Sequence, residues 1–174
     1  KHYFIKDDEI EDKVAENPVD RCYHCKKTEF GNVKEFAELK GVTTIFDGTN
    51  LDDLGDYRPG MQAVSELGVI SPLKDAEFTK EDIREMSKIL NLKTWDKPSF
   101  ACLASRVPYG EKITTEKLSK IEKSEEFLKQ FGFKQFRVRA HEDIARIEVA
   151  PEEREKIFST NIMNKISIRS EEYT

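Results

Sequence analysis

The spacing of the hydrophobic residues changes along the chain. In the first half, short apolar runs alternate with stretches in which apolar residues recur every three or four positions. Such runs are typical of buried strands, and such stretches are typical of helices with one buried face. The runs predict strands or extended turns at 2–5, 42–46 and 69–73, and the stretches predict helices at 20–40, 59–67 and 79–90. Strands that alternate with helices indicate an α/β domain with a parallel sheet.

Local signals mark the ends of these helices. Asp20 precedes the first helix, where its carboxylate can accept the free amides of the first turn, and Gly41 suits the C-terminal end. Thr79 and Asp82 have the spacing of a capping box at the start of the third helix. We expect the apolar stripe of that helix to be buried; it comprises Ile83, Met86 and Leu90. The acidic stretch at 7–16 predicts a solvated loop or a poor helix.

The second half has a different pattern. Thr114 can cap a helix that ends at Gly132, and a last helix is predicted at 151–164. Between them, the runs 134–140 and 144–149 alternate apolar and charged residues, which is typical of a β-hairpin. We place a domain boundary near residue 110. Residues 1–110 are then an α/β domain, and residues 111–174 a small α+β domain.

Composition narrows the class of protein. The chain has 174 residues, 37% hydrophobic and 36% charged, and no apolar run long enough to span a bilayer, so we expect a protein that is not membrane-embedded. Its net charge is −5, with both signs interleaved, which argues against nucleic acid as a partner. An odd count of three cysteines argues against a disulfide framework and favours the reducing cytoplasm.

The three cysteines are the strongest candidates for chemistry. Cys22 and Cys25 fall in the first turn of the predicted first helix, where the helix dipole favours thiolates. Cys102 lies between two proline-bounded turns, with Arg106 as a local positive charge. Together the thiolates can bind zinc with a fourth ligand such as His24, or an iron–sulfur cluster with one iron left open. Three reduced cysteines that never meet are an equal alternative on spacing alone.

Two further segments carry candidate binding residues. The segment 47–60 follows a predicted strand, and ligands of open α/β sheets bind beyond the carboxyl ends of strands. Its carboxylates can hold the magnesium ion of a nucleotide, while Thr49 and Asn50 can hydrogen-bond a base or ribose. In the predicted hairpin, Arg137 and Arg139 project from one face and suit a phosphate. The alternatives are a solvated acidic loop and two exposed arginines on an edge strand.

Three motifs follow one another along the chain: NPVDRCYHCKK at 17–27, DGTNLDDLGDYRPG at 47–60 and ACLASRVPYG at 101–110. In this order they resemble the ATP-dependent sacrificial sulfur transferases, the LarE-type proteins of the PP-loop ATP pyrophosphatase superfamily. The similarity covers nearly everything from 17 to about 156. It implies a partial Rossmann-like parallel sheet of the PP-loop (HUP) type, a smaller C-terminal α+β domain, and assembly as a homo-oligomer.

The resemblance also implies an activity. Family members use MgATP to adenylylate a carboxylate of a pyridinium mononucleotide, a precursor of the nickel-pincer cofactor of lactate racemase. A cysteine matching Cys102 then displaces AMP and forms a thioester. In one branch this cysteine gives up its own sulfur; in the branch with three cysteines, a 4Fe-4S cluster carries the donor sulfide. Because Cys22, Cys25 and Cys102 are all present, the second branch is the better match. ATP, Mg2+ and a 4Fe-4S cluster are the implied cofactors, and a small-molecule nucleotide is the implied substrate.

Individual positions carry over from the same resemblance. The residues on the nucleotide side are Asp47, Gly48, Thr49, Asn50 and Asp53, and those associated with phosphate are Ser105, Arg106, Arg137 and Arg139. Glu125 and Glu148 match weaker candidate positions. The Ser-Gly-Gly-x-Asp-Ser loop that binds the pyrophosphate of ATP in the family is not in this sequence, and the residues 166–174 lack the family's usual ending. We therefore expect an N-terminally truncated chain that binds ATP poorly by itself.

Two other functions fit parts of the pattern. A PP-loop tRNA thiolase also uses three cysteines and a cluster, but it should carry a basic face, which the net charge of −5 does not favour. A zinc-stabilised, non-enzymatic module would use the same cysteines structurally. The metal that the protein binds separates this alternative from the sulfur transferase.

Overall fold

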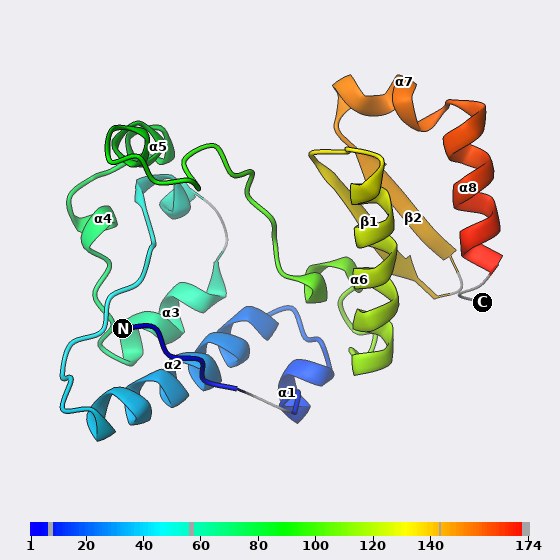
Figure 1. Cartoon of the computed structure of the whole chain (residues 1–174). Coiled ribbons are helices and arrows are strands. Elements are labelled where there is room, and N and C mark those ends of the chain that lie inside the picture. The colour runs from blue at the N-terminus through cyan, green and yellow to red at the C-terminus, as the bar shows by residue number, and fades with distance from the viewer. Residues whose placement is uncertain (7–8, 56–57, 143, 172–174) are drawn as a thin grey trace. The chain divides into compact units, whose positions relative to one another are not determined.

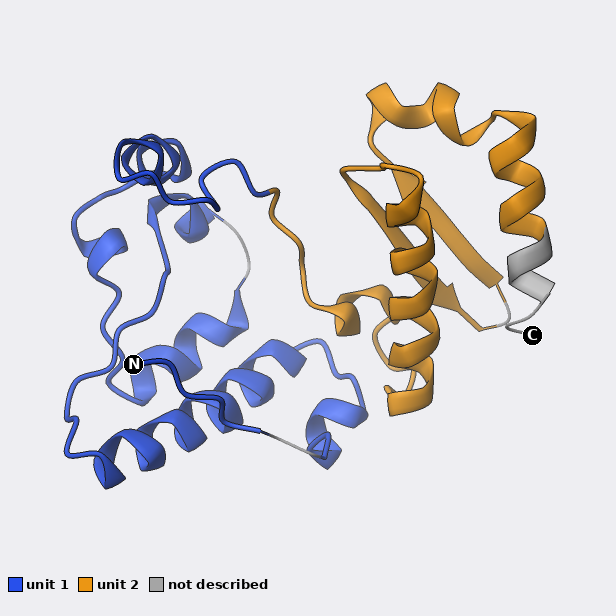
Figure 2. Ribbon diagram, viewed as in Figure 1, with its two compact units in different colours: residues 1–97 blue, residues 98–174 orange. Residues whose placement is uncertain are grey.

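The computed structural model describes residues 1–6, 9–55, 58–142 and 144–171, with side chains through residue 167. The chain divides into two compact units, Lys1–Lys97 and Pro98–Thr174, coloured separately in Figure 2. The division falls before the boundary expected near residue 110, so the segment 98–110 belongs to the second unit. It does so because Ser105 and Arg106 hydrogen-bond to Arg139 and Glu125.

The first unit is mainly helical (Figure 1). Its helices are α1 (Asp12–Ala15), α2 (Arg21–Leu39), the 3-10 helix η1 (Leu51–Gly55), α3 (Pro59–Glu66), α4 (Pro72–Asp75) and α5 (Lys80–Ile89). The predicted capping box of α5 is confirmed, because Thr79 and Asp82 exchange side-chain to backbone hydrogen bonds. Gly41 follows the end of α2 with φ +69°, as predicted. Asp20 precedes α2 as predicted, but its side chain does not cap the helix; it contacts Nε2 of His24 at 3.2 Å instead.

Helices α2 and α3 pack against each other at Gly60. A methyl group built on this glycine would lie 3.0 Å from Cγ of Lys26 and 3.1 Å from the carbonyl oxygen of Cys22. Such distances are tighter than normal van der Waals contact, so the helices approach this closely only because residue 60 has no side chain. The contact places the N-terminal turn of α2 directly against α3.

The parallel pairing in this unit is limited. The described residues contain one parallel bridge, between Phe46 and Ile70, made by hydrogen bonds from Asp47 N to Ile70 O and from Ile70 N to Ile45 O, each 3.0 Å long. The direction agrees with that of a parallel sheet. However, Phe46 is 61% exposed, so the prediction of a buried strand at 42–46 is wrong for this unit. The Rossmann-like sheet stays a prediction.

Two other expectations also fail, the strand at 2–5 and the burial of the apolar stripe of α5. The apolar residues at 2–5 form no strand, and Phe4 is 87% exposed. Met86 and Leu90 of the predicted α5 stripe are exposed as well. An amphipathic pattern shows which face of a helix is apolar, but it does not show which element covers that face. Residues 7 and 8 of the acidic stretch lie outside the described residues.

The second unit combines a hairpin with helices (Figure 1). Its elements are the 3-10 helix η2 (Leu103–Arg106), α6 (Thr115–Gln130), β1 (Phe136–His141), β2 (Ile144–Val149), the 3-10 helix η3 (Pro151–Glu153), α7 (Arg154–Ile157) and α8 (Thr160–Glu171). Thr114 caps α6 by accepting a hydrogen bond from Lys117 N at 3.1 Å, and Gly132 follows its end with φ +73°. Both signals were predicted.

The hairpin register fixes two faces. Phe136 pairs with Val149 and Val138 with Ile147, so these apolar side chains share one face. That face forms the core with Leu128 of α6 and with residues of α8. Helix α6 lies along β1, and helix α8 lies along β2 (Figure 1). The predicted hairpin is therefore confirmed, although residue 143 of its turn lies outside the described part.

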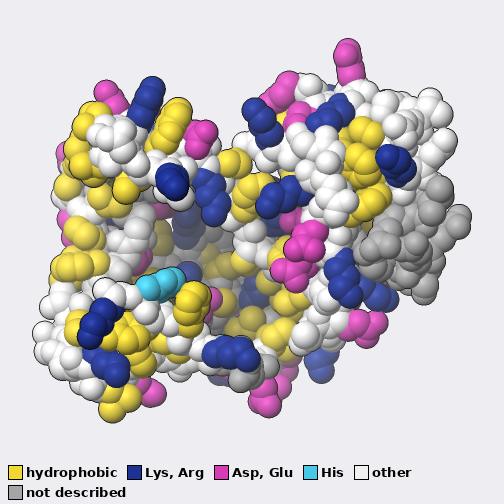
Figure 3. Space-filling model, viewed as in Figure 1, with side chains coloured by type: hydrophobic (Ala, Val, Ile, Leu, Met, Phe, Trp, Pro, Cys, Tyr) yellow, Lys and Arg dark blue, Asp and Glu magenta, His cyan; other side chains and the backbone are white. Residues whose placement is uncertain are grey.

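The C-terminal region differs from the single helix predicted at 151–164. It begins with η3 and continues as α7, which ends before Phe158. The following helix, α8, extends to Glu171, beyond the predicted end. None of the helices that the structure describes combines the length and apolar composition needed to cross a bilayer. On the visible face of each unit, acidic and basic side chains are interspersed (Figure 3).

Candidate functional site

Cys102 is the residue immediately before η2. Its backbone is extended (φ −61°, ψ 151°), and its side chain is exposed. The carbonyl of Cys102 accepts hydrogen bonds from Ser105 N at 3.0 Å and from Ser105 Oγ at 2.7 Å. The backbone of the cysteine is thus fixed while the residue is exposed, which suits a nucleophile that must reach a substrate.

The buried side chain of Arg106 hydrogen-bonds to the backbone of the loop that carries Cys102. Its side chain is only 1% exposed, and every guanidinium nitrogen donates to a protein group. Nη1 reaches the carbonyl oxygens of Ala101 at 2.9 Å and Cys102 at 3.2 Å, and Oγ of Ser105 at 3.0 Å. Nε and Nη2 bind Glu125. The phosphate role expected for Arg106 is not tested by these contacts, but a phosphate would have to replace some of them.

Glu125 of α6, a weaker candidate in the sequence, is the ion-pair partner of Arg106. Its carboxylate accepts from Nε of Arg106 at 2.8 Å, from Nη2 at 3.2 Å, and from the backbone N of Val138 at 3.0 Å. A signal for it was present in the sequence. Glu125 lies between Ile121 and Leu128 on the apolar face of α6, and an acidic residue on such a face needs a partner.

The second face of the hairpin is charged. Arg139 donates to Oε1 of Glu148 at 2.8 Å and to the carbonyl oxygen of Ser105 at 3.1 Å, and Arg146 donates to the same Oε1 at 2.7 Å. Burial acts to raise the pKa of Glu148, but the hydrogen bonds from the two arginines outweigh it and hold this pKa below its ordinary value. Two of the three arginines on this face are therefore already paired.

Arg137 is the third arginine on the charged face of the hairpin. The register places it opposite Glu148 and on the same face as Arg139, so the two predicted arginines do project together. Among the described residues its guanidinium has no hydrogen-bond or ion-pair partner. It lines a pocket of about 210 Å³ together with Ser99, Phe100, Gln135 and Glu148, whose carboxylate is already paired with Arg139 and Arg146. An unpaired guanidinium beside polar groups can bind a carboxylate or phosphate in two-point fashion.

The other two cysteines lie in the first unit. Cys22 is in the first turn of α2 and Cys25 one turn further on, and both are half-buried. Sγ of Cys25 lies 3.4 Å from Oε1 of Glu29, and Nη2 of Arg21 lies 4.0 Å from Sγ of Cys22. Cys102 belongs to the second unit. Within the described residues of either unit, no group of three His, Cys, Asp or Glu side chains is arranged to hold a metal.

The predicted nucleotide segment is a hydrogen-bonded turn. Asp47 accepts from Thr49 N at 3.2 Å and from Thr49 Oγ1 at 2.5 Å. Asp53 accepts from Asn50 N at 3.0 Å and pairs with Arg58 at 2.7 Å. Both carboxylates therefore stabilise their own turn here, and the predicted roles of these residues and of Gly48 in binding nucleotide and magnesium remain predictions. Residues 56 and 57 lie outside the described part.

Comparison with known proteins gives relatives but no family model that matches the chain. An uncharacterised protein of Synechocystis sp. is 45% identical over 137 residues, which cover 79% of this chain and 51% of that protein. The pyridinium-3,5-bisthiocarboxylic acid mononucleotide synthase of Lactiplantibacillus plantarum is 38% identical over 144 residues, or 83% of the chain and 52% of the synthase. An uncharacterised protein of Methanocaldococcus jannaschii is 38% identical over 138 residues, or 79% of the chain and 54% of that protein.

The chain thus spans about half the length of the curated relatives it matches. Over most of its own length it is homologous to the Lactiplantibacillus plantarum synthase. This homology supports the resemblance to LarE-type sulfur transferases.

Proposed function

We propose that this chain is the Cys102-bearing part of an ATP-dependent sulfur transferase in nickel-pincer cofactor synthesis. Homology to a synthase of a bisthiocarboxylic acid mononucleotide over 83% of the chain supports the proposal. The observation that carries it lies in the second unit. The exposed Cys102 follows Ser99 and Phe100, which line the pocket containing Arg137, so that one short segment bears a candidate nucleophile and borders a pocket with a guanidinium in its wall.

In the proposed reaction, an oxygen of the substrate carboxylate attacks the α-phosphorus of MgATP, so that pyrophosphate leaves and an acyl adenylate forms. The thiolate of Cys102 attacks the acyl carbon, a C–S bond forms, and AMP leaves with the electrons of the broken C–O bond. AMP is a much better leaving group than hydroxide, which is why the carboxylate is activated first. Arg137 binds an anionic group of the substrate in its pocket, and Arg106 holds the loop that presents the thiol.

Sulfur can reach the product in two ways. If Cys102 donates its own sulfur, a base removes the Cα proton, the Cβ–S bond breaks, and dehydroalanine and a thiocarboxylate remain. Thiolate donors such as Cys22, Cys25 and Cys102 suit an iron–sulfur cluster chemically, and the first two lie on one face of α2. With a 4Fe-4S cluster bound, Cys102 would be one of its ligands and not the nucleophile, and the cluster would supply the transferable sulfide. Because all three cysteines are present, we favour this second source.

The decisive assay is sulfur transfer by the complete protein with MgATP and the corresponding pyridinium dicarboxylate mononucleotide. Mass spectrometry should detect a thiocarboxylate product, and Cys102→Ser should abolish it. If Cys22→Ala keeps full multi-turnover transfer, the cluster version is wrong. A loss of H2S from residue 102 after one turnover would then identify Cys102 as the sulfur donor. If no thiocarboxylate forms under any of these conditions, the proposed function is wrong.

Metal and RNA measurements separate the rival functions. Stoichiometric zinc without iron–sulfur absorbance after anaerobic purification would favour the zinc-stabilised module. RNA binding that weakens steeply with salt would favour the tRNA thiolase. Neither result is expected, since a sulfur transferase of this kind needs iron or no metal at its cysteines and recognises a small molecule.

A further inference from the structure

Three elements of the second unit meet at the carboxylate of Glu125. The residue itself is on α6, its partner Arg106 is at the end of η2, and its third hydrogen bond comes from the backbone N of Val138 on β1. The two bonds to Arg106 form a fork-on-fork pair, in which Nε donates to Oε1 and Nη2 to Oε2. Such two-point pairs fix the orientation of the guanidinium as well as its position.

The pair is largely removed from water. The side chain of Arg106 is 1% exposed and that of Glu125 is 11% exposed. In this setting each charge depends on the other, because a buried guanidinium without its carboxylate is strongly unfavourable. Removal of the Glu125 charge should therefore turn Arg106 out of its present position rather than leave it in place.

Arg106 in turn fixes the cysteine. With Nε and Nη2 bound to Glu125, its Nη1 is aimed at the carbonyl oxygens of Ala101 and Cys102 and at Oγ of Ser105. The carbonyl of Cys102 thus receives hydrogen bonds from Arg106 and twice from Ser105. These contacts set the backbone from which the exposed thiol projects.

We propose that Glu125 is a positioning residue for Cys102, which acts through Arg106 and touches neither the thiol nor a substrate. The inference rests on the proposed function and deepens it, in that it takes Cys102 to act there as the nucleophile or as a cluster ligand. It also explains the acidic residue on the apolar face of α6: the carboxylate anchors the cysteine loop to the helix and to β1 at once.

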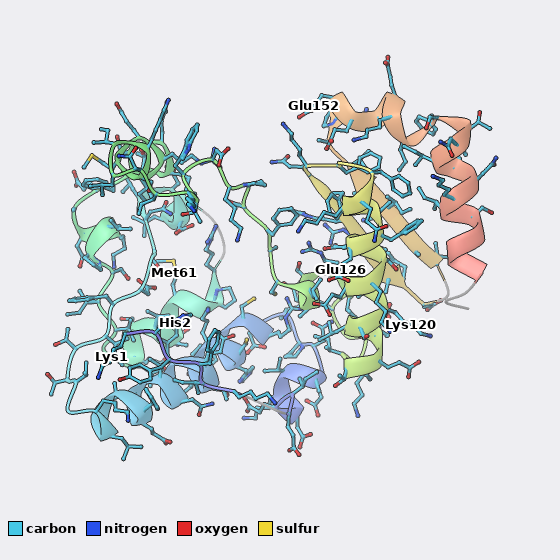
Figure 4. All side chains as sticks on the ribbon, in the orientation of Figure 1. Lys1, His2, Met61, Lys120, Glu126 and Glu152 are labelled. Carbon is cyan, nitrogen blue, oxygen red and sulfur yellow. The ribbon has the colours of Figure 1, made fainter. Side chains whose placement is uncertain are left out.

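The test compares Glu125→Gln with Glu126→Gln. Glu126 is the next residue of α6 and is exposed (Figure 4), so its variant controls for the loss of one acidic group from the same helix. Hydrogen exchange is measured at the amides of residues 101–107, among them Ser105 N, which donates to Cys102 O. We expect exchange there to quicken by about tenfold in Glu125→Gln and to stay unchanged in Glu126→Gln. Amides of the first unit serve as the internal reference.

A double-mutant cycle with Arg106→Gln shows whether Glu125 acts through the arginine. Once Arg106 is replaced, Glu125→Gln should add little to the rate of hydrogen exchange in the loop. It should also add little to the rate of Cys102 alkylation, which peptide mass spectrometry follows. The effects of the two substitutions should therefore be non-additive. In the sulfur-transfer assay, Glu125→Gln should lower kcat by about tenfold with KM nearly constant, because the Arg137 pocket is left intact. Glu125→Asp, which keeps the charge but is shorter, should restore kcat only in part.

Wild-type loop exchange in Glu125→Gln, or additive effects in the cycle, would overturn the proposal. If Glu125→Gln does not fold, Glu125→Asp provides the same exchange comparison. The exchange and alkylation measurements need no sulfur transfer, so they still decide the role of Glu125 if the proposed function fails.

Discussion

The contact between α2 and α3 gives a quantitative test of the structure around Cys22. In Gly60→Ala, the added methyl group would lie 3.0 Å from Cγ of Lys26 and 3.1 Å from the carbonyl oxygen of Cys22. The lysine side chain can move, but the carbonyl belongs to the backbone of α2, so the two helices must separate by a few tenths of an ångström. Overpacking of this kind costs about 1–3 kcal/mol.

Gly31→Ala is the matched control. Gly31 lies within α2, and nothing lies within 4 Å of a methyl group built on it. This variant should stabilise the unit by about 0.5–1 kcal/mol, because alanine is the better helix former. Both variants restrict the unfolded chain equally, so that contribution cancels in the comparison. Gly60 also lies in a helix, α3, so the gain in helix propensity is shared by the two variants. Gly60→Ala should therefore be less stable than Gly31→Ala by the overpacking cost of about 1–3 kcal/mol.

Urea unfolding followed by fluorescence measures this difference. The chain has one tryptophan, Trp95, which lies in the first unit and therefore reports on it. With a slope of about 1–3 kcal/mol per molar urea, the midpoints of the two variants should differ by about 1 M. Equal midpoints would refute the close approach of α3 to Cys22. Because the strained atom is the carbonyl of Cys22, loss of stability should also be accompanied by faster alkylation of that cysteine.

Two further measurements test the caps and the surface charges. Thr114→Ala removes the hydrogen bond that Lys117 N donates and should destabilise the second unit by about 1 kcal/mol in urea unfolding followed by circular dichroism, whereas Thr114→Ser should not. Hydrogen bonds, the largest from Tyr23, lower the pKa of Glu66 to about 2. The stabilisation from this carboxylate is therefore present above its ordinary pKa and is lost as the pH falls towards 2. Tyr23→Phe should raise the pKa of Glu66 in an NMR titration; an unchanged titration would contradict the hydrogen bond.

The sequence predicted those elements whose signals are local. Helix α6 begins after Thr114 and is followed by Gly132, α5 begins with its capping box, and the hairpin pairs the two alternating runs. In each case the side chains that end or pair the element are within a few residues of it, so no knowledge of the remaining fold was needed.

The predictions that failed depended on partners far away in the sequence. The apolar stripe of α5 and the run at 42–46 were expected to be buried, yet Leu90 is 64% exposed and Phe46 remains exposed with one bridge. Periodicity shows that a face is apolar and leaves open what lies against it. The same reasoning applies to Arg106. Its charge near Cys102 was evident, but its partner Glu125 is on another helix, and only the fold brings the two together.

The pairing of charges in the second unit separates the roles of its arginines. Arg106 is neutralised by Glu125 and held by backbone carbonyls, while Arg139 and Arg146 share Glu148. A group already engaged in this way gains little from a bound anion, because it must first give up a hydrogen bond of similar strength. Arg137 has no such partner among the described residues and faces a pocket. Anion binding in the proposed reaction therefore depends chiefly on Arg137, while Arg106 contributes through the geometry of the Cys102 loop.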